Sequence, residues 1–117
     1  MMKNILTLMI FIFFSRTLFA QCDSAYTYYP ALPLNVTILS GDTCLSDNDM
    51  VVLDSLISIN DLAYGSPLGL GTQTWFNGRL RFLVSGNYGN SFGVNDTIYS
   101  LPDNIGNWDN IASLYLE

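Results

Sequence analysis

The chain has 117 residues, which is enough for one domain and too few for two well-formed ones. Half of its residues are hydrophobic, and its formal net charge is −6, with four basic residues, ten acidic residues and no histidine. Because phosphate binding depends on basic side chains, this balance argues against nucleic-acid recognition.

Residues 1–20 have the layout of a secretory signal peptide. Lys3 precedes a largely apolar run of ten residues over 5–14. This run is too short for a membrane anchor, since a spanning helix needs about 20 apolar residues. We therefore predict cleavage between Ala20 and Gln21, no membrane span in the mature chain, and a secreted or cell-surface location.

The mature chain, residues 21–117, would carry only Arg79 and Arg81 against ten acidic residues, a net charge of −8. Its cysteines, Cys22 and Cys44, favour a disulfide in an oxidising compartment, whereas a reducing compartment would leave two free thiols. The disulfide would close a loop of about 23 residues and contribute about 3 kcal/mol. Two cysteines without a histidine make a poor zinc site, so we expect no metal and no cofactor. A lipid anchor on the first cysteine is the less favoured alternative, because glutamine precedes it instead of a small residue.

A helix is predicted over residues 47–59, after an extended, loop-rich segment over 21–45. Ser46 is a favourable N-cap, and Asp49 lies at the position where a capping box places Glu or Gln. The buried stripe of this helix is expected to consist of Val52, Leu53, Leu56, Ile57 and Ile59. We interpret the aspartates 47, 49 and 54 as capping or solvated surface residues, not as calcium ligands or a catalytic acid pair.

Two strands are predicted in the second half of the chain. Asn77-Gly78 is a strong tight-turn dipeptide, and the first strand candidate follows it over 79–84. A Gly- and Asn-rich loop over 88–97 and a return segment over 101–108 come next. The second strand is predicted over 111–116.

Both predicted strands fit the repeat pattern L-x-x-L-x-L. Ile111-Ala-Ser-Leu-Tyr-Leu116 matches it at every apolar position, whereas the first strand has Leu80 and Leu83 but Ser85 in place of the last leucine. The equivalent positions Leu80 and Ile111 are 31 residues apart. An ordinary repeat has about 20–29 residues, so the excess is expected in the loop between the strands.

Over roughly residues 44–117, the chain resembles the N-terminal region of secreted bacterial leucine-rich repeat proteins. The resemblance is carried by the two strands, the capped helix, Gly-x-x-x-Trp-x-Asn-Gly-Arg-Leu over 71–80 and Leu-Pro-x-x-Ile-Gly from Leu101. The resemblance implies an α/β fold that begins a solenoid: a capping helix, then about two irregular repeats with short parallel strands. It implies a capping region over 21–71 and incomplete first repeats over 72–117, so the chain is expected to be the truncated front of a longer array. A small α+β domain with leucines at these spacings is the alternative.

In the repeat template, residues between the leucines face outward on a concave surface. These candidate binding residues are Arg81, Phe82, Ala112, Ser113, Tyr115 and Glu117. An aromatic next to a charge suits a contact surface, although exposed strand residues without a ligand explain the same pattern. Catalysis is not expected, because the mature chain has no histidine, no lysine and no phosphate-binding motif. We therefore predict an exported binding module for a protein or a glycan; the alternative is a small, independently folded structural protein of the cell envelope.

Overall fold

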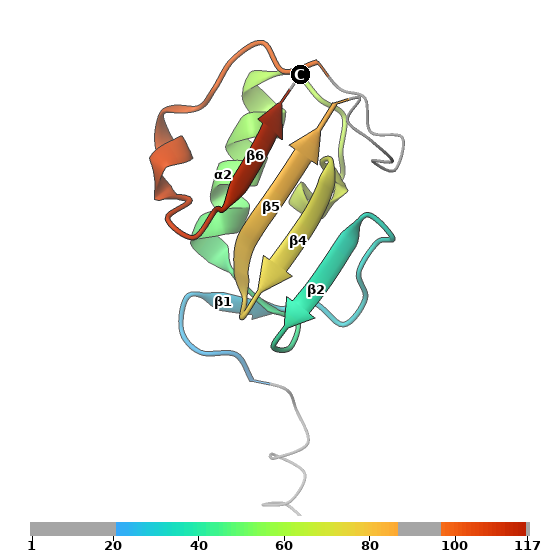
Figure 1. Cartoon of the computed structure of the whole chain (residues 1–117), viewed down its shortest axis with the longest axis vertical. Coiled ribbons are helices and arrows are strands. Elements are labelled where there is room, and N and C mark those ends of the chain that lie inside the picture. The colour runs from blue at the N-terminus through green and yellow to red at the C-terminus, as the bar shows by residue number, and fades with distance from the viewer. Residues whose placement is uncertain (1–20, 87–96, 117) are drawn as a thin grey trace, which may run out of the picture.

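The computed structural model describes residues 21–86 and 97–116, and within these ranges one α-helix packs against a four-stranded sheet, with a two-stranded sheet beside it (Figure 1). The strands are β1 (Tyr26–Tyr28), β2 (Val36–Ser40), β3 (Cys44–Ser46), β4 (Thr72–Phe76), β5 (Arg79–Ser85) and β6 (Ser113–Leu116). The helix is α2 (Asp47–Ile59), and two short 3₁₀ helices are η1 (Pro67–Gly69) and η2 (Asp103–Asn107). The predicted α/β class is therefore confirmed. The predicted signal peptide, residues 1–20, and most of the predicted loop over 88–97 lie outside the described residues.

The helix α2 begins and ends at the predicted residues. Ser46 is its N-cap and its hydroxyl accepts a hydrogen bond from the backbone N–H of Asp49, 3.3 Å away. Asn60 is the C-cap, and its Nδ2 donates to the carbonyl oxygen of Leu56 at 2.9 Å. Its Oδ1 accepts the N–H groups of Tyr99 and Ser100, at 2.7 and 2.9 Å, in the chain that returns from the sheet. Side chains at both ends of the helix therefore satisfy backbone groups that the helix itself cannot pair.

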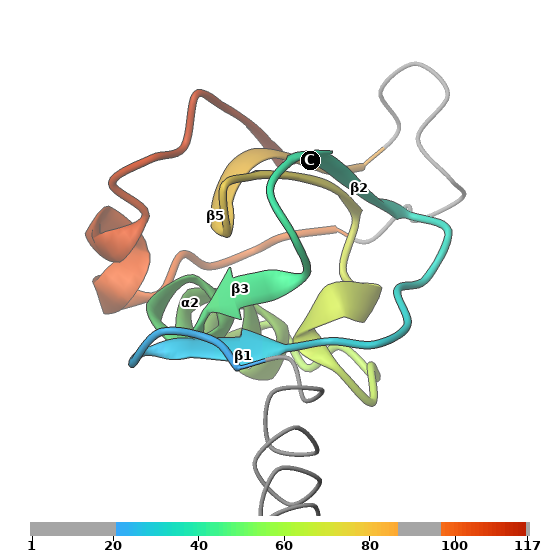
Figure 2. The same ribbon diagram turned by 90° about the horizontal axis from the view of Figure 1, so that it is seen from below.

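The four-stranded sheet has the order β2-β4-β5-β6, with an antiparallel pair, β4 and β5, flanked by two parallel pairs. A parallel pair needs a crossover connection. The connection from β2 to β4 contains α2, and the connection from β5 to β6 contains η2, which packs on α2. Figure 2 shows α2 on one side of the sheet, and Figure 1 looks onto the other side, where no described element covers the strands.

The prediction of an extended, loop-rich segment over 21–45 is wrong in part, because this segment contains three strands. β1 pairs with β3 in a small antiparallel sheet, and β2 becomes the edge of the main sheet by pairing in parallel with β4. The partners in that parallel pair are far apart in sequence, Val36 with Gln73 for example. The segments predicted as capping region and first repeats therefore share one sheet.

The predicted tight turn joins β4 to β5. Both Asn77 and Gly78 have positive φ angles, 51° and 80°, as a two-residue hairpin turn of type I′ requires. Glycine is also needed here for space, since a Cβ on Gly78 would lie 2.6 Å from the carbonyl oxygen of Cys44. The same glycine accepts the N–H of Ser46 at 2.8 Å, so the turn packs directly against the start of the helix.

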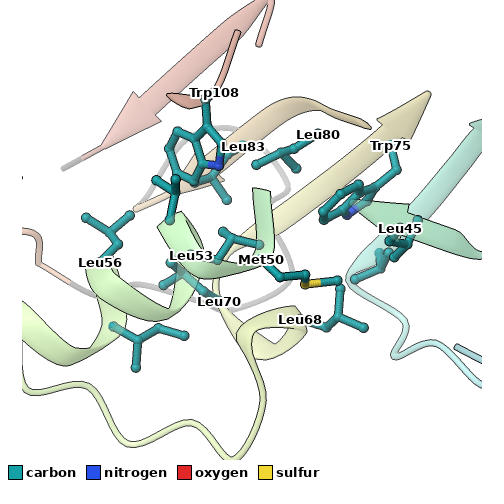
Figure 3. Close-up of a cluster of buried hydrophobic side chains, with 13 residues drawn as sticks. Leu45, Met50, Leu53, Leu56, Leu68, Leu70, Trp75, Leu80, Leu83 and Trp108 are labelled. Atoms are coloured by element: carbon teal, nitrogen blue, oxygen red, sulfur yellow. The ribbon is translucent and has the colours of Figure 1, made fainter. Parts of the chain in front are cut away.

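The hydrophobic core lies between α2 and the sheet (Figure 3). Trp75, Leu80 and Leu83 project from β4 and β5 toward Leu53 and Leu56 of the helix, and all five are at most 1% exposed. The predicted helical stripe is correct except at its last residue, since Ile59 is 49% exposed.

The strands β5 and β6 pair in parallel, and each paired residue of β5 faces the residue 31 positions later, from Phe82 with Ser113 to Ser85 with Leu116. This is the offset at which the two strands align in the sequence pattern. Leu114 shares a face with the buried Leu83, as predicted, but it is 38% exposed because β6 is at the sheet edge of the described chain.

The predicted disulfide between Cys22 and Cys44 is present, with a Cα–Cα distance of 5.6 Å. It joins the first described residues to the start of β3 and so to the N-terminus of α2. An intramolecular disulfide is consistent with an extracellular protein. Over the described ranges, no helix is long and apolar enough to cross a membrane.

Candidate functional site

The candidate site is the open face of the sheet, which is the surface opposite α2. It consists of Thr37 of β2, Thr74 and Phe76 of β4, Arg81 and Phe82 of β5, and Ser113 and Tyr115 of β6. Strand alternation creates it, because Gln73 and Trp75 point into the core at 0% exposure while their neighbours point away. Phe76 is 40% exposed and Phe82 is 37% exposed, so two aromatic rings contact solvent on this surface.

Four of the predicted binding residues lie together on the open face. Thr74 pairs with Phe82 and Trp75 pairs with Leu80, so Arg81 is the extra residue of a β-bulge. The bulge lets Arg81 and Phe82 both point outward between two buried leucines. Ser113 lies opposite Phe82, and the partly exposed Tyr115 lies opposite Val84. Of the other two predicted residues, Ala112 contacts β5 through its backbone, since its N–H donates to the carbonyl oxygen of Arg81 at 2.7 Å. Glu117 lies outside the described residues.

The half of this surface that β2 and β4 provide was not predicted from the sequence. Thr37, Thr74, Phe82 and Ser113 form one row of directly paired positions across all four strands. Paired side chains on neighbouring strands are about 5 Å apart, so the hydroxyl groups of Thr74 and Ser113 flank the Phe82 ring and that of Thr37 lies one strand further along the row. The polar–apolar alternation of Thr72-Gln-Thr-Trp-Phe76 could have indicated β4, but Gln73 at a core position hides the alternation.

Gln73 is buried because its amide group is fully used. Its Nε2 donates to the carbonyl oxygens of Pro67 and Leu70 at 2.9 and 2.8 Å, and its Oε1 accepts the indole N–H of Trp75 at 3.1 Å. A buried amide is stable when each of its groups is paired. Gln73 thereby fixes η1 and Trp75 beneath the open face, so the exposed residues of β4 are displayed from a rigid strand.

Charge is distributed unevenly between the sheet and the rest of the chain. No acidic residue occurs in β2, β4, β5 or β6, whereas both arginines of residues 21–117 belong to β5. Arg79 is neutralised: its Nε donates to Asp49 Oδ2 at 2.9 Å, and its Nη2 contacts Asp109 Oδ1. The hydrogen bond with Asp49 raises the pKa of Arg79 above its usual value, and Asp109 adds to this effect.

Asp49 is not the solvated surface residue that we predicted. It is 1% exposed, and besides the ion pair its Oδ2 accepts the backbone N–H of Leu80 at 2.9 Å. Its own carbonyl oxygen accepts the indole N–H of Trp108 at 3.1 Å. One residue of the helix N-terminus therefore joins β5 to the segment that leads into β6, and this network sets the position of β6 on the open face.

Arg81 has a different environment from Arg79. Its guanidinium carbon lies 5.4 Å from the centroid of the Phe76 ring, which is a cation–π contact. Among residues 21–86 and 97–116, no carboxylate forms an ion pair with it. The open face therefore carries an uncompensated positive charge on an acidic protein.

Comparisons of the chain with protein-family models, with curated proteins and with solved structures found no match. A function must therefore be argued from the geometry. In the described part of the chain, no group of three or more His, Cys, Asp or Glu side chains could hold a metal ion.

Three hollows in the described structure lie away from the open face. One, of about 450 Å³, is beside the disulfide, and another, of about 360 Å³, is beside Arg79 at the start of α2. The third, of about 630 Å³, lies between the last turns of α2 and the segment 102–104. None of these three hollows is lined by an exposed aromatic side chain of the main sheet.

Proposed function

We propose that this chain is an exported recognition module of the leucine-rich repeat type, which binds a protein or a glycan through the open face of its sheet. The observation that carries the proposal is the uncovered sheet surface with two exposed phenylalanines next to an arginine that has no carboxylate partner in the described chain. Aromatic residues and arginine are enriched where proteins contact their partners.

The pairing of β5 with β6 supports the repeat type. In a solenoid, equivalent positions of successive repeats stack on one another, and here Leu83 stacks with Leu114 and Ser85 with Leu116. The connecting segment returns on the side of α2, so the repeat leaves the opposite surface free. The disulfide supports export, because such bonds persist in oxidising compartments.

The test uses the purified chain and a panel of immobilised polysaccharides and peptides, with binding measured by surface plasmon resonance. We expect at least one class to bind, and we expect the double variant Phe76→Ala, Phe82→Ala to lose most of that binding. Val51→Ala is the control, since Val51 is an exposed apolar residue, 55%, on the outer surface of α2 and away from the open face. The proposal fails if nothing on the panel binds, or if the control variant loses as much binding as the double variant.

A further inference from the structure

We infer that the ligand of the open face is an acidic polysaccharide, and that Arg81 binds one of its carboxylate groups. This inference rests on the proposed function and names the chemistry of its ligand. Three features of the open face support it: the charges on its strands, the environment of Arg81, and the row of hydroxyl groups beside Phe82.

The charge of the sheet selects an anion. The eight acidic residues of the described chain all lie outside β2, β4, β5 and β6, in the N-terminal segment, α2 and the connections. Within the described residues, the four strands of the open face therefore carry arginine but no carboxylate, so this surface suits a negative ligand. Arg79 cannot serve, because Asp49 and Asp109 already neutralise it.

The geometry around Arg81 leaves its hydrogen-bond donors available. The guanidinium carbon of Arg81 lies over the Phe76 ring, 5.4 Å from the ring centroid. The five N–H donors of arginine point outward in the guanidinium plane, and within the described residues none of those of Arg81 is used in a hydrogen bond. A planar carboxylate fits such a fork with two parallel hydrogen bonds, and the ring limits the motion of the fork before the ligand arrives.

The shape of the surface favours a sugar chain over a peptide. Peptide side chains that contribute strongly to binding usually fill pockets. Phe76, Arg81 and Phe82 line none of the three hollows described above. An exposed ring such as Phe82 can instead stack on the apolar side of a pyranose. Thr37, Thr74 and Ser113, in one row with Phe82 across the sheet, offer hydroxyl groups to the hydroxyl groups of neighbouring sugars.

The test is titration calorimetry of the full chain with two matched probes, oligogalacturonate with free carboxylates and the same oligomer fully methyl-esterified. We expect the free acid to bind at least about tenfold more tightly, as one charge-assisted hydrogen-bonding pair allows. Arg81→Gln should remove that difference, leaving the methyl ester unaffected. Increasing salt should weaken binding of the free acid to the wild type but not to Arg81→Gln.

The outcomes separate this inference from the proposed function. If both probes bind equally and Phe82→Ala weakens both, the open face still binds but the assignment of an anion to Arg81 is wrong. If an oligoglutamate peptide binds more tightly than oligogalacturonate and depends on Arg81, the polysaccharide is the wrong ligand class. If neither oligosaccharide nor the peptide binds, the inference fails, and the panel of immobilised polysaccharides and peptides described above still tests the proposed function.

Discussion

The two faces of the main sheet are built by alternate residues of the same strands, yet they have opposite properties. The covered face carries Trp75, Leu80 and Leu83 at 1% exposure or less, packed on α2. The open face carries Phe76 and Phe82 with more than a third of each side chain exposed. Aromatic residues occur on both faces, so hydrophobicity alone does not distinguish the core residues of the covered face from the candidate binding residues of the open face. The two faces differ because both crossover connections, from β2 to β4 and from β5 to β6, pass on the same side of the sheet and cover that face.

The largest effect should come from the covered face. Trp75→Ala removes a fully buried indole and is expected to lower the free energy of unfolding by about 3–5 kcal/mol. Phe76→Ala, at the next position of the same strand, should cost about 1 kcal/mol or less, since this ring is 40% exposed. Urea melts of both variants measure the difference. Equal losses would show that the open face is also a packed surface.

The next effect concerns the network that positions β6 beside β5. Asp49→Ala leaves the partly buried Arg79 without its main partner and the N–H of Leu80 without an acceptor, so we expect a loss of about 3 kcal/mol. Asp54→Ala, an exposed position on the same helix, should change stability by about 0.5 kcal/mol or less. Thermal and urea unfolding of the two variants provide the measurement. A mild effect at Asp49 would mean that packing alone holds β6.

A smaller effect of opposite sign is expected at Ser85, on the covered face. Its side chain is fully buried and its hydroxyl has no hydrogen-bond partner in the described structure. Ser85→Ala removes this unpaired group and should leave stability unchanged or raise it by about 1 kcal/mol. Ser113→Ala, at an exposed position on the open face, should have no measurable effect. A clear loss of stability in Ser85→Ala, measured by urea unfolding, would reveal a hidden role for the hydroxyl.

A small change in stability is expected at Phe82. Phe82→Ala should lower the free energy of unfolding by about 1 kcal/mol or less, as for Phe76, because the ring is 37% exposed on the open face. Its effect should appear in binding, as a weaker response to whichever ligand the wild type binds. Calorimetric unfolding and surface plasmon resonance on the same sample test both parts. If the variant unfolds easily, the open face is needed for folding and the contrast between the faces is lost.

Local signals explain what could be predicted from the sequence. Ser46 and the acidic residues after it determine where α2 begins, and Asn77-Gly78 determines the hairpin, since both features act over a few residues. The alignment of β5 with β6 was also accessible, because the same apolar spacing occurs twice.

Long-range pairing explains what could not be predicted. The strand β2 gains its place only after α2 brings the chain back to β4, and no local pattern encodes that parallel pair. The burial of Asp49 depends on Arg79, thirty positions later. From the local sequence alone, an aspartate in the first turn of a helix is equally well explained as an exposed residue that stabilises the helix N-terminus. Phe76 was missed for the same reason, since the face it occupies is defined only when all four strands are in place.

The disulfide has a mechanical consequence. Cys22 and Cys44 are 22 positions apart in the chain, but the bridge places their Cα atoms within 5.6 Å. Tension applied at residue 21 would pass through the two sulfur atoms to β3 and the start of α2. The chain between the cysteines, including the edge strand β2, would carry no load. A pull from this end would therefore strain the helix and its core before it could peel the sheet, and the open face would keep its shape until the core itself gives way.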